Sequence, residues 1–262
     1  VNQLQSIRNY YDFNDIDIVK YDVDGKPSAV AMTGRELNTV ELPENNKSFL
    51  NEKLRFTHGY GLVALRVNQV TEEGQPSFLI KDIPPVCEED FVTIRQPRIY
   101  FGETGAEYSI VNSGYKELDY SEGDKDVEFS YDGNAGIKMN LLNRIIYSVK
   151  YKDFQLLISS LVNNESKLLI NKNVVERVSV AAPFLAVSDD PYILIDESGR
   201  LKWIVDCFTS SEYYPYSQPV KFKGDTVNYI RNSVKAVVDA YDGEVKFYIT
   251  DKTDPIAECY NK

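Results

Sequence analysis

Short runs that alternate apolar and polar residues, separated by glycine and proline, fill the chain from Gly61 to about residue 132. The runs read GLVALRVNQV, SFLIKDI, PRIYFGE, EYSIVNS and VEFSYD, and Pro84 and Pro85 stand among the breaks between them. Alternation with a period of two places successive side chains on opposite faces of a strand, and turn residues between such runs mark strand ends. This part of the chain is therefore expected to be rich in β-strands.

Three turn signals predict antiparallel hairpins. Asp24-Gly25 lies between two alternating runs in DIDIVKYDVDGKPSAVAMTGREL, and Ser198-Gly199 interrupts YILIDESGRLKWIVD. Such pairs favour the tight turns that connect adjacent strands. The third signal, Asp242-Gly243, is ambiguous because apolar residues before it also fit a helical spacing; these are Ile230, Val234, Val237, Val238 and Tyr241. We favour the hairpin, in which residues 233–241 pair with residues 244–250, since the second run alternates cleanly.

Four segments are expected to be helical. The clearest is IKMNLLNRIIYSV, which places Ile137, Leu141, Ile145 and Val149 on one stripe. NVVERVSVAA predicts a helix that ends before Pro183. VNQLQSIRNYYDF, with Leu4, Ile7 and Tyr11 on one face, and SFLNEKLRF, capped by Ser48, predict shorter helices. Together these patterns predict an α+β fold, rich in β-strands with antiparallel hairpins and a few helices, and a candidate boundary between two lobes at residues 132–136.

Charge and hydropathy restrict the class of protein. The net charge of the 262 residues is −11, and a surface of that sign repels phosphate backbones, so nucleic acid is not expected as a partner. No apolar run approaches the roughly 18 residues that span a bilayer, so the chain is expected to fold alone in solution. Cys87, Cys207 and Cys259 form no CxxC pair and do not indicate a cellular compartment.

The chain contains one histidine, His58, within LRFTHGYGLV. A single histidine excludes sites built from several histidines, and no GxSxG motif presents a serine nucleophile. FGETGAEY lacks the lysine of a phosphate-binding loop, and no cofactor is expected. Gly59 and Gly61 would allow an unusual backbone path beside His58, which suits either a site or a tight turn. For a lone histidine, the structural role is the more common one.

Acidic residues are dense in DYSEGDKD, which carries Asp119, Glu122, Asp124 and Asp126. Carboxylates are the ligands that Ca²⁺ prefers, so these four residues are weak calcium candidates. A solvated loop is the more common structure for such a run. YDVDGK imitates the start of a calcium loop but lacks its closing glutamate, and a turn is the better interpretation.

The segment DCFTSSEYYPYSQP, residues 206–219, concentrates three tyrosines at positions 213, 214 and 216. Tyrosine offers a flat apolar ring with a polar tip, which suits a binding surface. The segment could equally be a loop fastened over the core by its own rings. If Pro215 and Pro219 hold it extended, Tyr214 and Tyr216 face opposite ways, and one ring anchors near Trp203 while another stays accessible.

Several segments together resemble the uncharacterised protein family 0182. They are RNYYDFNDIDIVKYDVDGK, LRFTHGYGLV, QPRIYFGE, VAAPFLAVSDDPYILIDESGRLKWIVDCFTSSEYYPYSQP and NYIRNSVKAVVDAYDGEVKFYITDKTDP, in order along nearly the whole chain. The resemblance implies a large bacterial protein with transmembrane helices upstream of this soluble part, at the cell membrane and on its extracytoplasmic side. The family patterns THGYG, YPYS and NYIRN mark His58, Tyr60, Tyr214, Tyr216 and Arg231 as candidate residues for binding a ligand or partner. Tyr213, from the tyrosine-rich segment, is a further candidate.

Two hypotheses of function follow. The first is a non-enzymatic extracytoplasmic domain that binds an envelope component or a partner protein. The second is a cell-envelope enzyme, such as a hydrolase, that uses His58 and nearby carboxylates. A concave pocket containing His58 would favour the enzyme. Exposed rings at Tyr213, Tyr214 and Tyr216 would favour binding, and the first hypothesis is preferred because no complete catalytic signature is present.

Overall fold

A computed structural model describes residues 11–37, 39, 47–89, 91–104, 106–122 and 125–261. The fold is α+β and strand-rich, with antiparallel pairing between neighbouring strands, which confirms the predicted fold class. Of the predicted N-terminal helix, Leu4 and Ile7 lie outside the described residues. The prediction is wrong at Tyr11, which lies in strand β1 (Tyr11–Asp12) and pairs with β4 (Glu36–Leu37). Its ring contacts a small apolar cluster with Leu37, Phe56 and Leu118, so packing decides its conformation.

The first large sheet has the strand order β2-β3-β6-β7-β8. Its strands are β2 (Asp17–Val23), β3 (Lys26–Gly34), β6 (Leu62–Val70), β7 (Pro76–Lys81) and β8 (Val86–Cys87). The predicted hairpin between β2 and β3 is confirmed. Asp24 and Gly25 both have positive φ, 55° and 71°, which is the geometry that a tight two-residue hairpin turn requires.

The second large sheet has the order β15-β17-β20-β21, with β16 also paired to β17. Its strands are β15 (Ala186–Val187), β16 (Tyr192–Ile195), β17 (Leu201–Ser211), β20 (Tyr229–Asp239) and β21 (Val245–Ile249). The predicted hairpins at Gly199 and Gly243 are both confirmed. β20 is a strand rather than a helix because both of its edges are paired, to β17 and to β21, which satisfies its backbone groups along the sheet.

A smaller sheet has the order β10-β14-β13, and four two-stranded ribbons complete the β-structure. The sheet contains β10 (Tyr108–Val111), β13 (Ile137–Lys138) and β14 (Lys167–Ile170). Besides β1 with β4, the ribbons pair β5 (Gly59–Tyr60) with β9 (Arg98–Ile99), β11 (Glu117–Glu122) with β12 (Lys125–Phe129), and β18 (Val220–Phe222) with β19 (Asp225–Val227).

The helices are short, and three of them begin with a side-chain cap from Asn or Asp. They are η3 (Leu50–Arg55, a π-helical turn), α1 (Leu141–Lys150), α2 (Gln155–Ile158), α3 (Val174–Ala181) and α4 (Pro255–Tyr260). The predicted Ser48 cap is present, since Ser48 Oγ accepts from the Asn51 backbone N–H at 3.2 Å. Helix α1 begins later than predicted, because Ile137 and Lys138 pair with β14 as a strand. Asn140 then caps the first turn of α1. No helix in the described ranges is long and apolar enough to cross a membrane.

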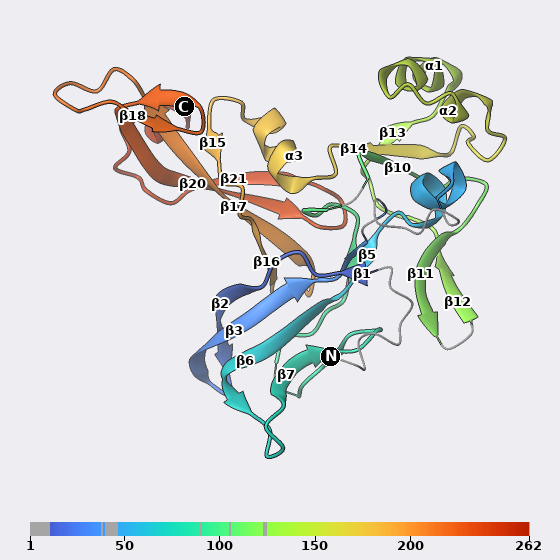
Figure 1. The fold of residues 1–262 in the computed structure, drawn as a ribbon, viewed down its shortest axis with the longest axis horizontal. Helices are drawn as coiled ribbons and strands as arrows, with labels where there is room; N and C mark the ends of the chain where they lie inside the picture. The colour runs from blue at the N-terminus through green and yellow to red at the C-terminus, as the bar shows by residue number, and fades with distance from the viewer. Residues whose placement is uncertain are drawn as a thin grey trace.

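Figure 1 shows the first large sheet below, the second above it on the left, and the smaller sheet with α1, α2 and η3 at the upper right. The two large sheets share one core cluster, which includes Met32 and Leu62 of the first sheet and Trp203 and Val238 of the second. Trp203 is buried and donates to the Phe101 backbone oxygen at 2.9 Å. Leu54, Ile110, Met139, Leu156 and Leu168 form part of a second cluster. The lobe boundary at 132–136, between β12 and β13, stays a prediction.

Candidate functional site

The THGYG segment is held against the neighbouring strand by its glycines. A Cβ added to Gly59 would lie 2.1 Å from the Arg35 backbone oxygen, closer than real Cβ atoms ever approach. Gly61 has φ +72°, which L-residues rarely adopt. The Tyr60 backbone N–H donates to the same Arg35 oxygen at 3.0 Å. The glycines therefore let this segment approach the backbone closely, and this positions His58 in the interior.

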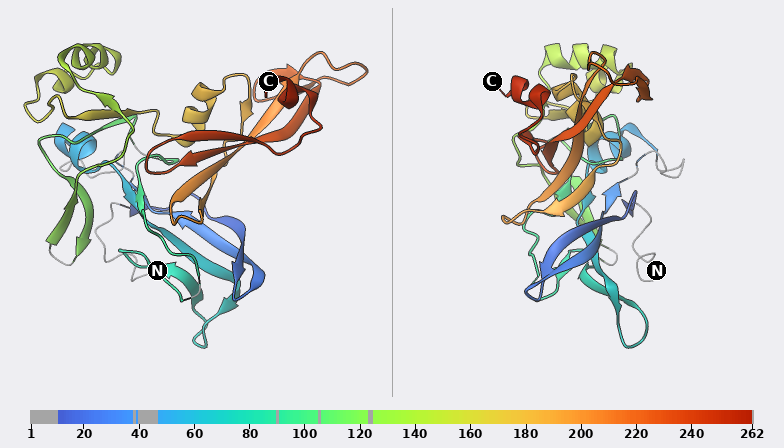
Figure 2. Two further views of the ribbon diagram at one scale, coloured as in Figure 1. Left: turned by 180° about the vertical axis from the view of Figure 1, so that it is seen from behind. Right: turned by 90° about the vertical axis from the view of Figure 1, so that its left-hand side faces the viewer.

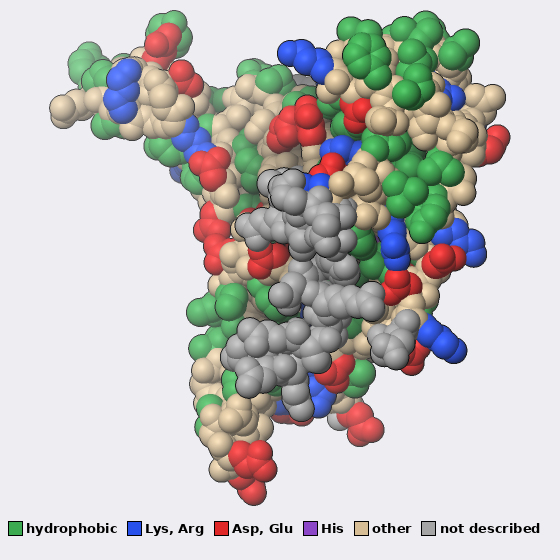
Figure 3. All heavy atoms as spheres, turned by 45° about the vertical axis from the view of Figure 1, so that its right-hand side comes forward, with side chains coloured by type: hydrophobic (Ala, Val, Ile, Leu, Met, Phe, Trp, Pro, Cys, Tyr) green, Lys and Arg blue, Asp and Glu red, His purple; other side chains and the backbone are tan. Residues whose placement is uncertain are grey.

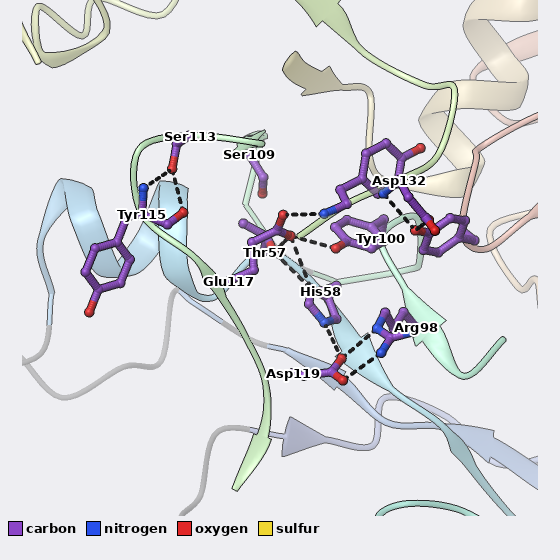
Figure 4. Close-up of polar contacts among 12 residues, drawn as sticks. Thr57, His58, Arg98, Tyr100, Ser109, Ser113, Tyr115, Glu117, Asp119 and Asp132 are labelled. Atoms are coloured by element: carbon purple, nitrogen blue, oxygen red, sulfur yellow. Dashed lines mark hydrogen bonds and ion pairs between the residues drawn. The ribbon is translucent and has the colours of Figure 1, made fainter. Parts of the chain in front are cut away.

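His58 lies in a buried polar network and is 1% exposed (Figure 4). Its Nδ1 is 2.9 Å from Thr57 Oγ1, and its Nε2 is 3.2 Å from Asp119 Oδ1. The Thr57 hydroxyl also donates to Glu117 Oε2 at 2.6 Å. Both ring nitrogens of His58 therefore have a buried polar partner within hydrogen-bond distance. A general base must reach the proton that it abstracts from a substrate, and here both nitrogens already face protein groups.

Glu117 is fully enclosed by donors. Besides Thr57, its carboxylate accepts from the Tyr100 hydroxyl at 2.6 Å and from the Tyr131 backbone N–H at 3.1 Å. Burial alone would raise the pKa of Glu117, but hydrogen bonds from His58, Thr57 and Tyr100 lower that pKa below its usual value. The carboxylate is therefore a satisfied acceptor inside the protein.

Asp119 forms the second half of the network. Arg98 donates to it twice, from Nε and Nη2, each at 2.7 Å, in the bidentate geometry of strong charge-assisted pairs. Burial would raise the pKa of Asp119, but the hydrogen bonds from His58 and Arg98 lower it. The Arg98 guanidinium also lies 3.5 Å from the centre of the Phe129 ring. These contacts connect β5, β9, β11 and β12.

Lys172 is a buried residue that the sequence did not single out. Its Nζ donates to the Thr57 backbone oxygen at 2.8 Å and to Ser109 Oγ at 2.7 Å. Burial, with a smaller contribution from the charge of Lys53, lowers the pKa of Lys172 to about 7. The neighbouring sequence, INKNVV, does not predict that Lys172 is buried, because its partners Thr57 and Ser109 are far away in the sequence.

Two surface cavities lie away from the histidine. One, of about 550 Å³, is lined by residues 17–21 of β2 together with Tyr192, Leu194 and Ile195. The other, of about 430 Å³, lies between β13, β14, α3 and the 242–245 turn. His58 lines neither of them.

Tyr60, like His58, is buried. The centre of its ring lies 5.1 Å from that of Tyr120, and burial raises the pKa of Tyr60 to about 12. The structure thus places two of the predicted binding residues in the interior.

The calcium candidates do not form a common site. The Asp119 carboxylate points to Arg98 and His58, whereas Asp126 accepts from Arg55 at 2.5 Å. Glu122 is exposed on β11, and Asp124 lies outside the described residues. Within the described ranges, no group of three or more histidine, cysteine or acidic residues is placed to hold a metal ion. Asp119 is therefore corrected to a structural role, because its charge is already matched by the partly buried Arg98.

The tyrosine segment projects from the second large sheet. Residues 212–228, here named the tyrosine arm, form the extended loop and the β18–β19 ribbon at the upper left of Figure 1, and Figure 2 shows the arm reaching beyond the body of the molecule. Tyr213 is 83% exposed, Tyr214 is 51% exposed and Tyr216 is fully exposed. The prediction that one ring anchors near Trp203 is wrong. Tyr216 has φ +61°, so the chain turns after Pro215 and the expected strand-like alternation is absent.

The base of the arm is held by the NYIRN segment. The Asn228 side chain accepts from the Tyr214 backbone N–H at 2.9 Å and donates to the Tyr214 backbone oxygen at 2.7 Å. The Tyr214 ring also stacks on Tyr229, with ring centres 5.2 Å apart. Phe222 of the arm meets Phe208 of β17 edge to face. The YPYS and NYIRN segments therefore form one structural unit.

Arg231, another predicted binding residue, supports this unit from below. Its Nε lies 3.0 Å from Asp251 Oδ2, and Nη1 donates to the Thr253 backbone oxygen at 3.3 Å. The neighbouring Tyr229 hydroxyl donates to Asp254, which caps α4. Arg231 thus joins β20 to the C-terminal segment, and its side chain remains 41% exposed.

Comparison with known proteins places the chain in a family. The model of the Uncharacterised protein family (UPF0182) matches residues 1–262. The chain belongs to UPF0182. UPF0182 proteins of Caldicellulosiruptor saccharolyticus and Clostridium tetani are 48% and 49% identical to it, over 99% and 100% of the chain. A UPF0182 protein of Clostridium acetobutylicum is 48% identical over 100% of it.

The UPF0182 relatives are much longer than this chain, which spans about 28% of the length of each of these three. No solved structure matches the chain. The family resemblance inferred from the THGYG, YPYS and NYIRN segments is confirmed. The descriptions of the UPF0182 family and of these relatives state no reaction and no partner.

Proposed function

We propose that this chain is a recognition domain of a larger bacterial membrane protein, and that its tyrosine arm binds a partner protein on the extracytoplasmic side. The observation that carries the proposal is the exposure of Tyr213, Tyr214 and Tyr216 on one projecting loop. A few residues supply most of the binding energy at protein interfaces, and Tyr is among the residue types enriched there. Exposed rings on an arm are therefore better explained by a partner than by the fold.

The arm is also preorganised for binding. Asn228 fixes the backbone of Tyr214 through two hydrogen bonds, and Pro215 removes one soft backbone angle beside it. A loop that is already ordered loses less conformational entropy when it binds. Tyr214 and Tyr216 thus resemble prepared anchors rather than a flexible tail.

The alternative of a hydrolase centred on His58 has less support. His58 is 1% exposed, both of its ring nitrogens lie within hydrogen-bond distance of buried protein groups, and neither cavity reaches it. A catalytic base must contact a substrate directly or through one water. The network instead resembles a fully satisfied polar core, which fixes the relative positions of the strands around it.

Site-specific photocrosslinking of the full-length protein in its own host tests the proposal. A benzophenone amino acid at position 216 is expected to give one discrete adduct, which is lost when Tyr213 and Tyr214 are both alanine. Val70, which is 69% exposed on a different strand, is the matched control position. Equal adducts at both positions, or none at 216, would contradict the proposal. An adduct that disappears on digestion with glycan hydrolases would identify an envelope glycan as the bound component instead.

The extracytoplasmic location is tested through Cys259, an exposed free thiol. A membrane-impermeant maleimide added to intact cells is expected to label the full-length protein at this residue. Cys259→Ser is the control, because it shows any labelling at other thiols: Cys87 is half-buried, whereas Cys207 is buried and burial raises the pKa of its thiol to about 11. Labelling that appears only after the cells are lysed would place this part of the protein on the cytoplasmic side.

A further inference from the structure

Helix α1 presents its aliphatic side chains to solvent. Leu141, Leu142, Ile145, Ile146 and Val149 are between 44% and 70% exposed, although their spacing puts them on one helical face. Two other side chains of α1 turn toward the protein: Ser148 is buried, and Arg144 donates to the Leu156 backbone oxygen of α2. A surface helix of a water-soluble protein usually has the reverse arrangement. The predicted stripe of Leu141, Ile145 and Val149 is thus present, but it points outward.

Helix α2 extends the same apolar surface. Phe154 and Ile158 are 72% and 71% exposed, and they lie one helical turn apart. Arg144 joins α1 to α2 through the backbone oxygens of Leu156 and Ser159. Figure 3 shows hydrophobic side chains gathered at the upper right of the molecule, over α1 and α2. We name this set of seven exposed side chains the α1–α2 face; it comprises Leu141, Leu142, Ile145, Ile146, Val149, Phe154 and Ile158.

The charge around this face differs in sign from that of the whole chain. Residues 133–164 contain one acidic side chain, Asp153, whereas the chain has a net charge of −11. Asp153 accepts from the Tyr108 hydroxyl. The same residues contain four basic side chains, Lys138, Arg144, Lys150 and Lys152. Residues 133–164 therefore carry an excess of positive charge.

We propose that the α1–α2 face binds the surface of an anionic lipid bilayer, with its aliphatic side chains at the boundary between headgroups and acyl chains. Interfacial helices combine an apolar face with lysine and arginine beside it, as α1 does. Lys150 Nζ also lies 5.1 Å from the Tyr151 ring centre and 5.8 Å from that of Tyr147, and tyrosine is enriched at membrane interfaces. This site is separate from the tyrosine arm and does not depend on the arm's function.

Flotation of the 262-residue chain with lipid vesicles tests this inference. The chain is expected to float with vesicles of phosphatidylcholine and phosphatidylglycerol in equal amounts, to bind pure phosphatidylcholine more weakly, and to dissociate as salt is raised. The pair Leu142→Glu and Val149→Glu should weaken binding by about tenfold or more, because two apolar contacts are replaced by charges of the lipid's own sign. Val70→Glu with Val86→Glu, at similarly exposed positions elsewhere, should leave it unchanged.

Fluorescence separates insertion from electrostatic adhesion. Tryptophan introduced as Leu142→Trp is expected to be quenched by brominated phospholipids, whereas Val70→Trp is not. The inference is overturned if the chain does not float with anionic vesicles, or if the control pair weakens binding as much as the α1–α2 pair. A third result would also overturn it: the chain does not bind vesicles but forms a concentration-dependent dimer, and Leu142→Glu abolishes that dimer. The α1–α2 face would then be a contact between two copies of the chain.

Discussion

At the scale of single residues, the interior is organised by polar contacts that are distant in sequence. His58 lies between Glu117 and Asp119, and Arg98 pairs with Asp119 from a different strand. A buried charge is costly unless it is paired and hydrogen-bonded, and each group in this network has such partners. The network therefore specifies how the ribbons around it are placed, and its stability depends on each member being present.

Asp119→Ala is expected to destabilise the fold by about 3–5 kcal/mol, since it leaves Arg98 and His58 without their carboxylate partner. Asp126→Ala is the matched control. It removes a carboxylate from the same ribbon, but its pair with Arg55 is partly exposed and should be worth no more than about 1 kcal/mol. Urea unfolding of both variants measures the difference. Similar small losses would mean that the buried network does not stabilise the fold.

Lys172 should make stability depend on pH above neutrality. Burial lowers its pKa to about 7, while the unfolded chain keeps this proton up to a pKa of about 10.4. Between these values the unfolded state binds more protons, so the free energy of unfolding rises with pH. Lys172→Met removes this dependence, and its unfolding free energy should rise less between about pH 7 and pH 9 than that of the wild type. Parallel curves for the two proteins would show that Lys172 stays charged in the folded state.

At the scale of elements, the hairpins were predictable and the long-range contacts were not. The turns at Gly25, Gly199 and Gly243 are specified by residues adjacent in sequence, and all three were predicted. The partners of His58 lie about 60 residues away, and no local pattern identifies them. For α1, the periodicity correctly predicted that Leu141, Ile145 and Val149 share one face of the helix. It did not predict that this face is exposed, because spacing alone does not say which face packs on the core.

Gly59→Ala tests the role of glycine in the THGYG segment. The new Cβ would collide with the Arg35 backbone, so the variant should lose about 1–3 kcal/mol or more of stability. Gly114→Ala is the control. Gly114, like Gly59, has no positive φ, and a Cβ added to it would lie 3.4 Å from the nearest atom, the Leu161 backbone oxygen. The Gly114→Ala substitution should therefore be neutral or slightly stabilising. Thermal unfolding gives the comparison, and equal melting temperatures would mean that the close approach at Gly59 relaxes without cost.

At the scale of the whole molecule, the two large sheets share a core that supports surfaces on opposite sides. The tyrosine arm extends from the second sheet on the left of Figure 1, and α1 and α2 lie on the right above the smaller sheet. Both surfaces expose apolar side chains that the described part of the chain leaves open to solvent. On the two proposals taken together, this chain contacts a partner protein through the arm while its α1–α2 face lies on a bilayer.

The measurement that tests the recognition role most directly compares stability and crosslinking in one variant of the arm. Replacing Tyr213, Tyr214 and Tyr216 together with alanine should change the unfolding free energy by no more than about 0.5 kcal/mol per ring, because all three are exposed. For crosslinking, the benzophenone amino acid is placed at position 217 both in this variant and in a protein that keeps the three tyrosines. The variant should lose the crosslinked partner, and the protein with the three tyrosines should keep it. Unchanged crosslinking, or a loss of stability of several kcal/mol, would show that the tyrosines fasten the fold and do not bind a partner.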